Sequence, residues 1–278
     1  MTIRLTILCE NTVARPFGLL GEHGFACFLE TPQGNYLFDT GQGQTLVSNA
    51  RYLNKDLTSI TALLISHGHY DHTGGLPQLL KICGRLNIYA HPDIFKHRYW
   101  DIEGQEHYLG IPFRREYLVC LGANFELHKS LVEVGPGVFL TGEIPRLNSF
   151  EKGDSSQWAV TEGGEEQKPD PLLDDLSMVV KSSKGLIIVL GCAHAGMANI
   201  IEYVSAMFPE EKIYAVVGGT HLGFAGSQQF EATLKLFDEY QIEKIGVSHC
   251  TGLPKAALLA EKLGERFFFG NVGNVLEV

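Results

Sequence analysis

The chain has 278 residues, of which 45% are hydrophobic and 19% charged, and its formal net charge at pH 7 is −10 with histidine neutral. These totals exclude a disordered chain and a small disulfide-stapled domain, and they allow a large apolar core. The acidic balance gives no electrostatic reason to bind nucleic acid, although it leaves room for a local basic pocket that takes a phosphate.

The six cysteines are scattered and form no CxxC motif, which favours a reducing compartment over a disulfide framework. No stretch approaches the ~18 uninterrupted apolar residues of a membrane span, and residues 1–10 lack the pattern of a secretory signal. We therefore expect a soluble, cytoplasmic protein with a small-molecule partner and neither a nucleic-acid nor a membrane partner. The sequence does not decide whether the protein forms a homo-oligomer.

The first half of the chain predicts strands that alternate with helical segments. Predicted helices cover residues 44–55 and 76–82, and predicted strands cover residues 3–9, 25–30, 35–38, 62–66 and 87–90. Residues 93–116 mix aromatic, charged and glycine residues without a clear period, so we expect an excursion over the core there. Short strands return between residues 119 and 140.

The second half begins with an irregular segment and then becomes regular. Residues 143–175 contain EKGDSS, EGGEEQK and PDP, which favour a long, partly mobile loop, either a lid or a solvated insertion. Beyond it we predict helices at 197–208, 228–240 and 254–263 and strands at 176–181, 186–190, 213–217 and 244–247. No low-complexity linker divides the chain, so we predict a single domain over 1–278 with excursions near 93–116 and 143–175.

Histidines follow directly after four predicted apolar strands. ALLIS runs into His67, LIIVLGCA into His194, IYAVVGGT into His221 and KIGVS into His249. Ligand sites in layered α/β structures form at the carboxyl ends of strands, so these four strands are expected to deliver imidazoles to one rim. Asp39 fits the same pattern because it follows NYLF directly.

The loop that begins at His67 concentrates metal-binding groups. His67 and His69 are two residues apart and can turn toward one ion, and Asp71 and His72 can reach a second ion beside it. Imidazole and carboxylate ligands suit zinc, with manganese, iron and nickel as alternatives. We therefore predict one or two divalent ions, zinc first. Three imidazoles and one carboxylate within six residues count against a chance surface cluster.

The segment SHGHYDHTGG, residues 66–75, resembles the HxHxDH signature of the metallo-β-lactamase superfamily, because it follows a strand and precedes a helix. FDTG with Asp39, GCAHAG with His194 and SHCTG with His249 follow in the family's order, so the resemblance covers essentially the whole chain. It implies an α+β fold, an αββα sandwich of two mixed β-sheets with flanking helices, and a site at one edge of the sandwich.

The resemblance also implies roles for the site residues. A first metal ion would be held by three imidazoles, those of His67, His69 and His194. A second would be held by Asp71, His72 and His249, and Asp39 would bond to the HxHxDH loop and orient it. Asp71 is also the expected catalytic residue, because its carboxylate can orient a water molecule or move its proton.

One position departs from the family pattern. Many hydrolases of the superfamily carry an aspartate that bridges both metals, after a strand between the third and last histidine motifs. This chain has VVGGTHL at that place, so His221 stands where the aspartate is expected. A neutral imidazole cannot bridge two cations, so a second metal would be weak, absent or differently held. We expect His221 to be a metal ligand or to contact the substrate.

GCAHAGMANI, GGTHL and SHCTG together resemble the 7,8-dihydropterin-6-methyl-4-(β-D-ribofuranosyl)aminobenzene-5′-phosphate synthase subgroup, which is assigned to methanopterin biosynthesis. The implied function is a metal-dependent enzyme, synthase- or transferase-like, acting on a phosphorylated, pterin-related small molecule. One alternative is a metal-dependent hydrolase of a phosphodiester, thioester or lactone. Another is a non-catalytic sensor of metal or ligand.

Further residues are candidates for substrate binding. Glu22 and His23 lie in a glycine-rich connection and can point into the site, or the connection is simply flexible. Thr220, Thr251 and Gly252 flank the last two histidine motifs at the start of a helix, where they either bind a phosphate or cap the helix.

Two sets of residues have competing interpretations. Cys192 and Cys250 stand beside predicted ligands and can bind zinc as thiolates, but we expect them to face the core. Aromatic residues of the first excursion either line a pocket for a flat ring or pack the excursion itself; they are Phe95, Tyr99, Trp100, Tyr108, Phe113 and Tyr117.

Overall fold

The computed structural model describes every residue except 1, 152, 154–155 and 161–166. Its first seven-stranded sheet has the order β18-β1-β2-β3-β4-β5-β8, antiparallel from β18 to β3 and parallel from β3 to β8. The strands are β1 (Arg4–Cys9), β2 (Ala26–Thr31), β3 (Gly34–Phe38), β4 (Ile60–Leu64), β5 (Leu86–Ala90), β8 (Ala123–Leu127) and β18 (Val275–Glu277).

The second seven-stranded sheet has the order β17-β16-β15-β14-β13-β10-β9, parallel from β14 to β17 and antiparallel elsewhere. Its strands are β9 (Val132–Gly135), β10 (Val138–Leu140), β13 (Ser177–Ser182), β14 (Gly185–Leu190), β15 (Ile213–Gly219), β16 (Lys244–Ser248) and β17 (Phe267–Phe269). All six residues of β14, GLIIVL, are buried, as expected for a strand covered on both faces.

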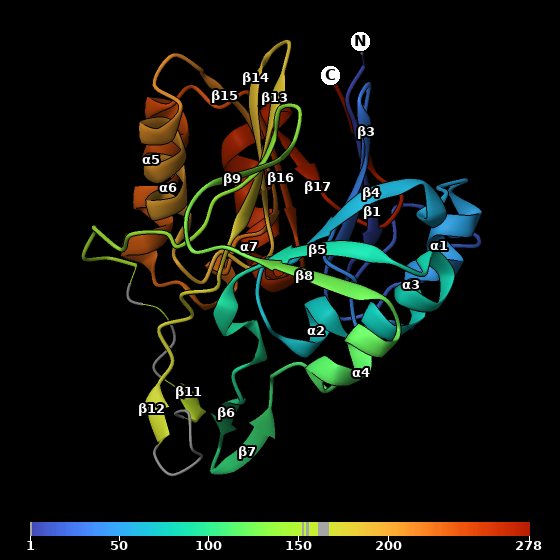
Figure 1. The fold of residues 1–278 in the computed structure, drawn as a ribbon. Helices are drawn as coiled ribbons and strands as arrows, with labels where there is room; N and C mark the ends of the chain where they lie inside the picture. Colours follow the sequence, from blue (N-terminus) through green and yellow to red (C-terminus); the bar gives the residue numbers. More distant parts are fainter. Residues whose placement is uncertain (1, 152, 154–155, 161–166) are drawn as a thin grey trace.

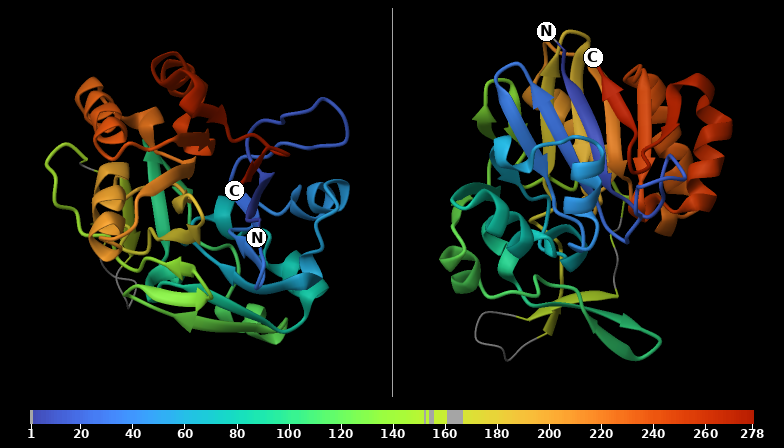
Figure 2. Two further views of the ribbon diagram at one scale, coloured as in Figure 1. Left: turned by 90° about the horizontal axis from the view of Figure 1, so that it is seen from above. Right: turned by 90° about the vertical axis from the view of Figure 1, so that its right-hand side faces the viewer.

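The two sheets pack face to face with helices outside them (Figures 1 and 2). Leu5 and Phe38 of the first sheet share one apolar core with Val180 and Val217 of the second. The outer face of the first sheet packs against α1 (Leu46–Tyr52), α3 (Leu76–Cys83) and α4 (Arg115–Cys120). The outer face of the second sheet packs against α5 (Met197–Met207), α6 (Ser227–Glu239) and α7 (Leu253–Leu263). The predicted αββα sandwich is confirmed.

The helices of the second half agree with the prediction to within one residue at each end. The first half agrees less well, because α1 is shorter than the predicted helix at 44–55 and α4 was not predicted. The α4 sequence, REYLVC, is only six residues long and is too short to display a helical period.

The two excursions contain regular structure that the sequence analysis did not predict. Strands β6 (Arg98–Ile102) and β7 (Gln105–Tyr108) of the first pair with β11 (Gln157–Val160) and β12 (Gln167–Pro169) of the second in a four-stranded sheet of order β12-β11-β6-β7. The long irregular segment expected at 143–175 therefore contains two short strands, while its described residues 143–151 and 170–175 form neither helix nor strand. Residues 152, 154–155 and 161–166 of the expected loop lie outside the described residues.

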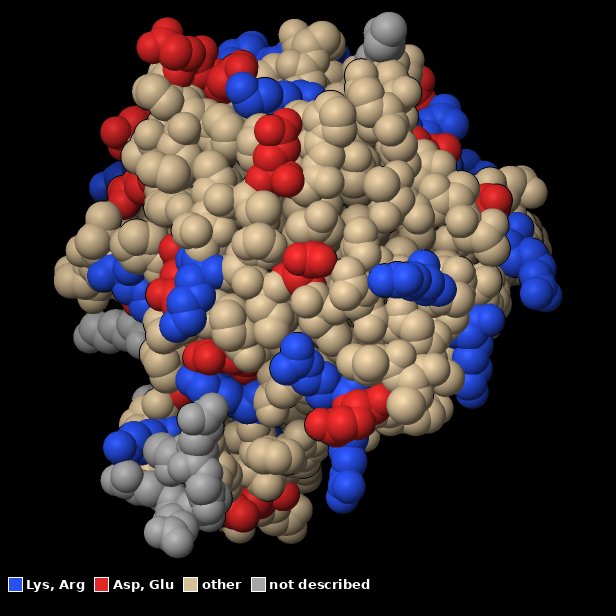
Figure 3. Space-filling model, viewed as in Figure 1, with Lys and Arg blue, Asp and Glu red and all other residues tan. Residues whose placement is uncertain are grey.

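Three further features concern the surface. Strands β1 and β18 pair, so the two chain ends lie side by side (Figure 2). Basic and acidic side chains are interspersed on the face that Figure 3 shows, which presents no continuous basic stripe among its described residues. Within the described residues, every helix is too short or too polar to cross a membrane.

Candidate metal centre

The candidate centre lies where strands of both sheets end. Asp39 follows β3, and the loop from β4 carries His67 and His69 into the short helix α2 (Tyr70–Thr73). The chain after β14 carries Cys192 and His194. Gly191 permits the two sheets to meet here, because a Cβ atom on it would collide with the side chain of Ser66. The glycine of GCAHAG thus lets the histidine motifs of the two halves approach each other.

Three of the predicted ligands form a buried cluster, which we call the first group: His67, His69 and His194. The His67 ring centroid lies 4.5 Å from that of His69 and 4.8 Å from that of His194, and the rings of His69 and His194 are 5.0 Å apart. The Nε2 atom of each ring is buried and has no hydrogen-bond partner among the described residues. Such orphaned nitrogens would cost free energy unless an ion binds them, so this group fits a metal ion. His67 and His194 form a set of potential ligands within 4.8 Å of one another together with Cys192, whereas His69 belongs to no such set among the described residues.

Burial also fixes the charge of the first group. Desolvation lowers the pKa of His69 to about 3, and it lowers the pKa values of His67 and His194 well below their ordinary value. All three rings are therefore neutral at neutral pH. A neutral imidazole offers a lone pair, which is the form that binds a metal.

A second group, Asp71, His72 and His249, lies beside the first. The Oδ2 atom of Asp71 is 3.1 Å from His249 Nε2 and 3.9 Å from His72 Nε2. His23, a predicted substrate-binding residue, places its Nε2 atom 3.2 Å from the same oxygen. Burial opposes ionisation of Asp71, but His72, His23 and His249 hold its pKa well below the ordinary value. The residue is therefore a carboxylate.

Asp39 lies beneath both groups and is fully buried. Its Oδ1 atom accepts the backbone N–H of Ser66 at 2.7 Å, and its Oδ2 atom lies 2.7 Å from both the Ser66 hydroxyl and His72 Nδ1. Burial would lower the pKa of His72, but Asp71 and Asp39 raise it to about 9. These hydrogen bonds have the orienting geometry expected of Asp39.

A buried ion-pair network supports the loop from the other side. Arg98 of β6 donates to Asp170 at 2.5 Å and to Asp174 at 2.6 and 2.9 Å, and Asp174 accepts the backbone N–H of Gly68 at 2.8 Å. The network therefore links both excursions to the residue between His67 and His69. The sequence analysis did not identify it, because its partners are about 70 residues apart.

Cys192 was expected to face the core, yet its thiol lies among the predicted ligands. Its Sγ atom is 3.2 Å from His72 Nε2. In the described residues, potential ligand atoms lie within 4.8 Å of one another in three sets: His67, Cys192 and His194; His72, Cys192 and His249; and His23, Asp71 and His249. The signal in the sequence was the CxH spacing after β14, which presents Cys192 and His194 on the same side of one loop.

His221 takes a different place from the two groups. Its ring centroid lies 4.4 Å from that of His194 and 4.6 Å from that of Phe224, and its backbone adopts the left-handed conformation with φ of 55°. Its backbone N–H donates to Cys250 Sγ at 3.2 Å. His221 is not a member of the three ligand sets formed by the described residues, but it lines the adjoining pocket.

The pocket beside the centre has a volume of about 570 Å³. Its lining includes Asp71, His194 and His249 of the candidate centre and Trp100, Ile102 and Tyr108 of the first excursion. His23 and Gly252 also line it. Trp100 meets Phe224 edge to face with ring centroids 6.2 Å apart. The pocket thus combines an apolar wall with a polar one, as ligand sites usually do.

The remaining predicted residues lie away from this pocket. Glu22 accepts the backbone N–H groups of Gln44 and Thr45 and so holds the turn after Asp39. The hydroxyls of Thr220 and Thr251 are 2.9 Å apart and buried. Among the aromatic residues, Tyr99 stacks on Trp158, and the other three lie outside the described lining; they are Phe95, Phe113 and Tyr117.

Comparisons with known proteins agree with this geometry. The chain is 29% identical to a 7,8-dihydropterin-6-methyl-4-(beta-D-ribofuranosyl)-aminobenzene-5'-phosphate synthase of Methanocaldococcus jannaschii, over 99% of this chain and 96% of that protein. A hydroxyacylglutathione hydrolase of Shewanella halifaxensis is 43% identical over 18% of this chain and 19% of its own length. A solved metal-dependent hydrolase of the beta-lactamase superfamily has a TM-score of 0.86 and 28% identity, with 99% of each chain covered.

The family model described as the metallo-beta-lactamase superfamily matches residues 21–204, which include the whole HxHxDH loop and His194. The chain therefore belongs to the metallo-β-lactamase superfamily, a superfamily of metal-dependent enzymes.

Proposed function

We propose that this protein is a metal-dependent enzyme that acts on a phosphorylated, pterin-related small molecule. The observation that carries the proposal is the first group, whose three unpartnered imidazole nitrogens lie beside a pocket with an aromatic wall. The full-length similarity to a protein named as a dihydropterin-linked synthase supports the substrate class.

The donor set indicates which residues would hold the metal. His67, His69 and His194 would bind a first ion, and Asp71, His72 and His249 a second, with zinc as the expected metal. A divalent ion there supplies Lewis acidity toward a phosphoryl or carbonyl oxygen. Asp39 keeps His72 in position through its Nδ1 atom, so that Nε2 faces the second group.

Two side chains are placed to handle protons. Asp71 is a carboxylate whose Oδ2 atom faces both His23 and His249, and it lines the pocket. The hydrogen bond to Asp71 raises the pKa of His23, and about half of the His23 side chain is exposed. Asp71 would therefore orient a water molecule or accept its proton. His23 would donate a proton, or a hydrogen bond, to a phosphate.

The pocket suits a flat ring. Its volume lies within the range of roughly 300–1,000 Å³ typical of small-molecule sites. Trp100 and Phe224 form an edge-to-face corner against which a pterin-like ring would stack. His221 packs on Phe224 at this corner, so we assign it to the substrate wall. Gly252 opens the eleven-residue helix α7 at the pocket, where backbone N–H groups favour a phosphate.

Product analysis tests this function. Zinc-loaded protein would be incubated with a dihydropterin pyrophosphate and an aminobenzene riboside 5′-phosphate, and products identified by mass spectrometry. We expect one product that contains both organic parts, formed only when both are present and lost in His67→Ala. We expect Trp100→Ala to keep its metal and to raise KM roughly 2- to 13-fold, the equivalent of about 0.5–1.5 kcal/mol of ring contact.

A hydrolase is the second candidate function. The similarity to a structure described as a metal-dependent hydrolase favours it, as does the short match to a hydroxyacylglutathione hydrolase. Reaction in ¹⁸O-labelled water separates the two, because a hydrolase needs one organic substrate and transfers the label into its product. Tight binding of the pterin without either product would instead favour a sensor and contradict both enzymes.

A further inference from the structure

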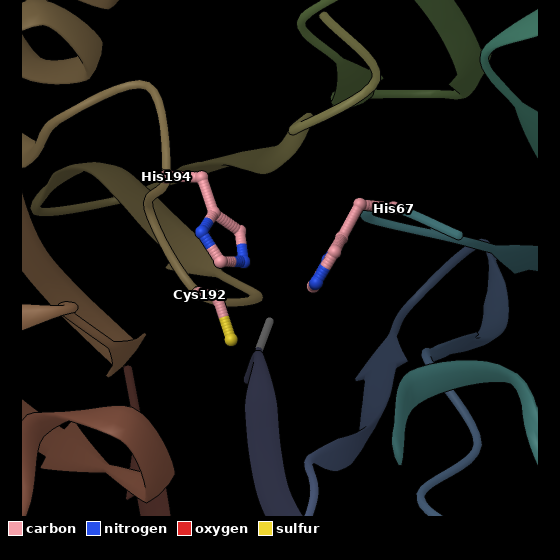
Figure 4. A group of neighbouring side chains, drawn as sticks. All are labelled: His67, Cys192 and His194. Carbon is pink, nitrogen blue, oxygen red and sulfur yellow. The ribbon is translucent and has the colours of Figure 1, made fainter. Parts of the chain in front are cut away.

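The thiol of Cys192 occupies an unusual place for a cysteine that follows a buried strand. Only 3% of the residue is exposed, and four of its neighbours are imidazoles: His67, His72, His194 and His249. Figure 4 shows the side chains of His67, Cys192 and His194 pointing toward a common space from loops of the two sheets. A structural cysteine would face apolar side chains instead.

The sulfur belongs to both halves of the candidate centre. Its Sγ atom lies within 4.8 Å of the ligand nitrogens of His67 and His194, and also within 4.8 Å of those of His72 and His249. In the described residues, Cys192 is the one side chain that the two sets have in common. An independent observation points to an ion there, because His67 Nε2 and His194 Nε2 are buried without a partner.

The predicted ligands of the two groups carry little negative charge. Two divalent ions carry four positive charges, and the imidazoles of both groups carry none when they bind metal. Asp71 contributes a single negative charge, and Asp39 is held by Ser66 and His72 beneath the loop. By the family resemblance, His221 stands where many hydrolases of the superfamily carry a bridging aspartate, and a neutral imidazole nitrogen has one lone pair. A thiolate has several lone pairs and a negative charge.

We propose that the Cys192 thiolate is a metal ligand shared by the two groups and that it replaces the missing bridging aspartate. The inference rests on the metal centre of the proposed function. On binding, the Cys192 S–H bond breaks, the proton passes to solvent, and the sulfur electron pairs bind the metal ions. No oxidant or reductant takes part.

Cobalt(II) titration of the full chain tests the inference without an activity measurement. A thiolate bound to cobalt(II) gives a charge-transfer absorption band in the near ultraviolet. We expect this band in the native protein, and we expect it to grow through the first and second equivalents of cobalt because the sulfur is shared. The band should disappear in Cys192→Ser, which should also bind fewer ions per chain.

Cys250→Ser is the matched control. The Cys250 thiol lies in the same region, where it donates to the backbone carbonyl of Cys192 at 3.4 Å, but it is outside the ligand sets of the described residues. The control should keep the band. X-ray absorption at the zinc edge of the native protein needs no variant and should detect a sulfur neighbour, so a folding defect in Cys192→Ser cannot hide the answer.

The outcomes separate this inference from the proposed function. Cobalt binding without the band, or a band that survives in Cys192→Ser, would overturn the sulfur ligand and leave the metal centre standing. A band that saturates after the first equivalent would overturn the shared role. Failure to bind any cobalt or zinc would overturn both the inference and the proposed metal-dependent function.

Discussion

The two groups of the candidate centre are neighbours, yet the hydrogen bonding of their polar atoms differs. In the first group, the Nε2 atoms of His67, His69 and His194 are buried and have no hydrogen-bond partner among the described residues. In the second, Asp71 already contacts His249 and His23, and Cys192 contacts His72. An ion bound by the three imidazoles of the first group displaces no hydrogen bond of their Nε2 atoms, whereas an ion in the second group must replace existing contacts. We therefore expect the first group to bind more tightly.

The supports of the two groups differ as well. The first depends on a long-range network, because Asp174 holds Gly68 between His67 and His69 and is itself paired with Arg98. Asp39 contacts His72 of the second group directly, and it reaches His67 of the first group only through the Ser66 hydroxyl. Changes to either support should therefore act on one group more than on the other.

The largest effect is expected from Arg98→Met. Removing one partner of a buried ion pair leaves Asp170 and Asp174 buried without their counter-charge, which should cost about 3–5 kcal/mol of unfolding free energy. Urea unfolding followed by circular dichroism measures it. The matched control adds Asp170→Asn and Asp174→Asn, which removes the stranded charges and should restore most of the stability. A single variant as stable as the native protein would show that the network does not hold the loop.

The next largest effect concerns the ligands themselves. His194→Ala should lower the affinity of the first ion by about 100-fold or more. This estimate assumes that one ligand of a four-ligand site contributes a quarter of the binding free energy. His249→Ala should weaken the second ion alone. Competition with a zinc-sensitive chelator measures both constants. If His249→Ala weakened the tighter ion more, the expected order of the two groups would be reversed.

Asp39→Asn should act more weakly and mainly on the second group. Asparagine tolerates the left-handed backbone of this position, whose φ is 59°, but it cannot accept from Ser66 and His72 as a carboxylate does. Loss of such an orienting partner commonly costs 10- to 100-fold in metal affinity, roughly 1.4–2.8 kcal/mol. The same competition assay measures it. An equal loss at both ions would mean that Asp39 supports the whole loop rather than His72.

Local sequence could predict much of this site because its residues follow strands directly. His67, His69 and Asp71 stand within one loop, and the position of that loop follows from the apolar run before it. The sandwich followed from the family motif and from the strand–helix order of the second half. These features depend on neighbouring residues, which a sequence displays.

Features that depend on distant pairing could not be predicted. Arg98 meets Asp170 and Asp174 only because strands β6 and β11 pair across the two excursions. No local hydrophobic period in the sequence indicates that pairing. Glu22 was expected near the substrate, but its carboxylate instead accepts backbone N–H groups of the turn after Asp39. Cys192 lies among the histidines only because Gly191, after β14, fits against Ser66, after β4.

The last contrast is a pH dependence that distinguishes the two groups in metal-stripped protein. Below the ordinary histidine pKa of 6.5, the side chains of His67, His69 and His194 take up protons in the unfolded chain but stay neutral in the folded protein. The free energy of unfolding should therefore fall as the pH falls from about 6.5 toward 3. The folded-state pKa of His72 is raised to about 9, so its contribution is complete below 6.5 and is lost as pH rises through about 9. Each such group contributes on the order of 1 kcal/mol per pH unit.

Urea unfolding of chelator-treated protein at a series of pH values tests this expectation. Stability should be greatest near pH 6.5 and should fall more steeply on the acid side, where three histidines act, than on the alkaline side, where His72 and His23 act. His69→Gln removes one of the three and should reduce the acid slope by about a third, because glutamine does not titrate. Equal slopes on both sides, or an acid slope unchanged in His69→Gln, would show that the first group is not held neutral, and the contrast between the two groups would then fail.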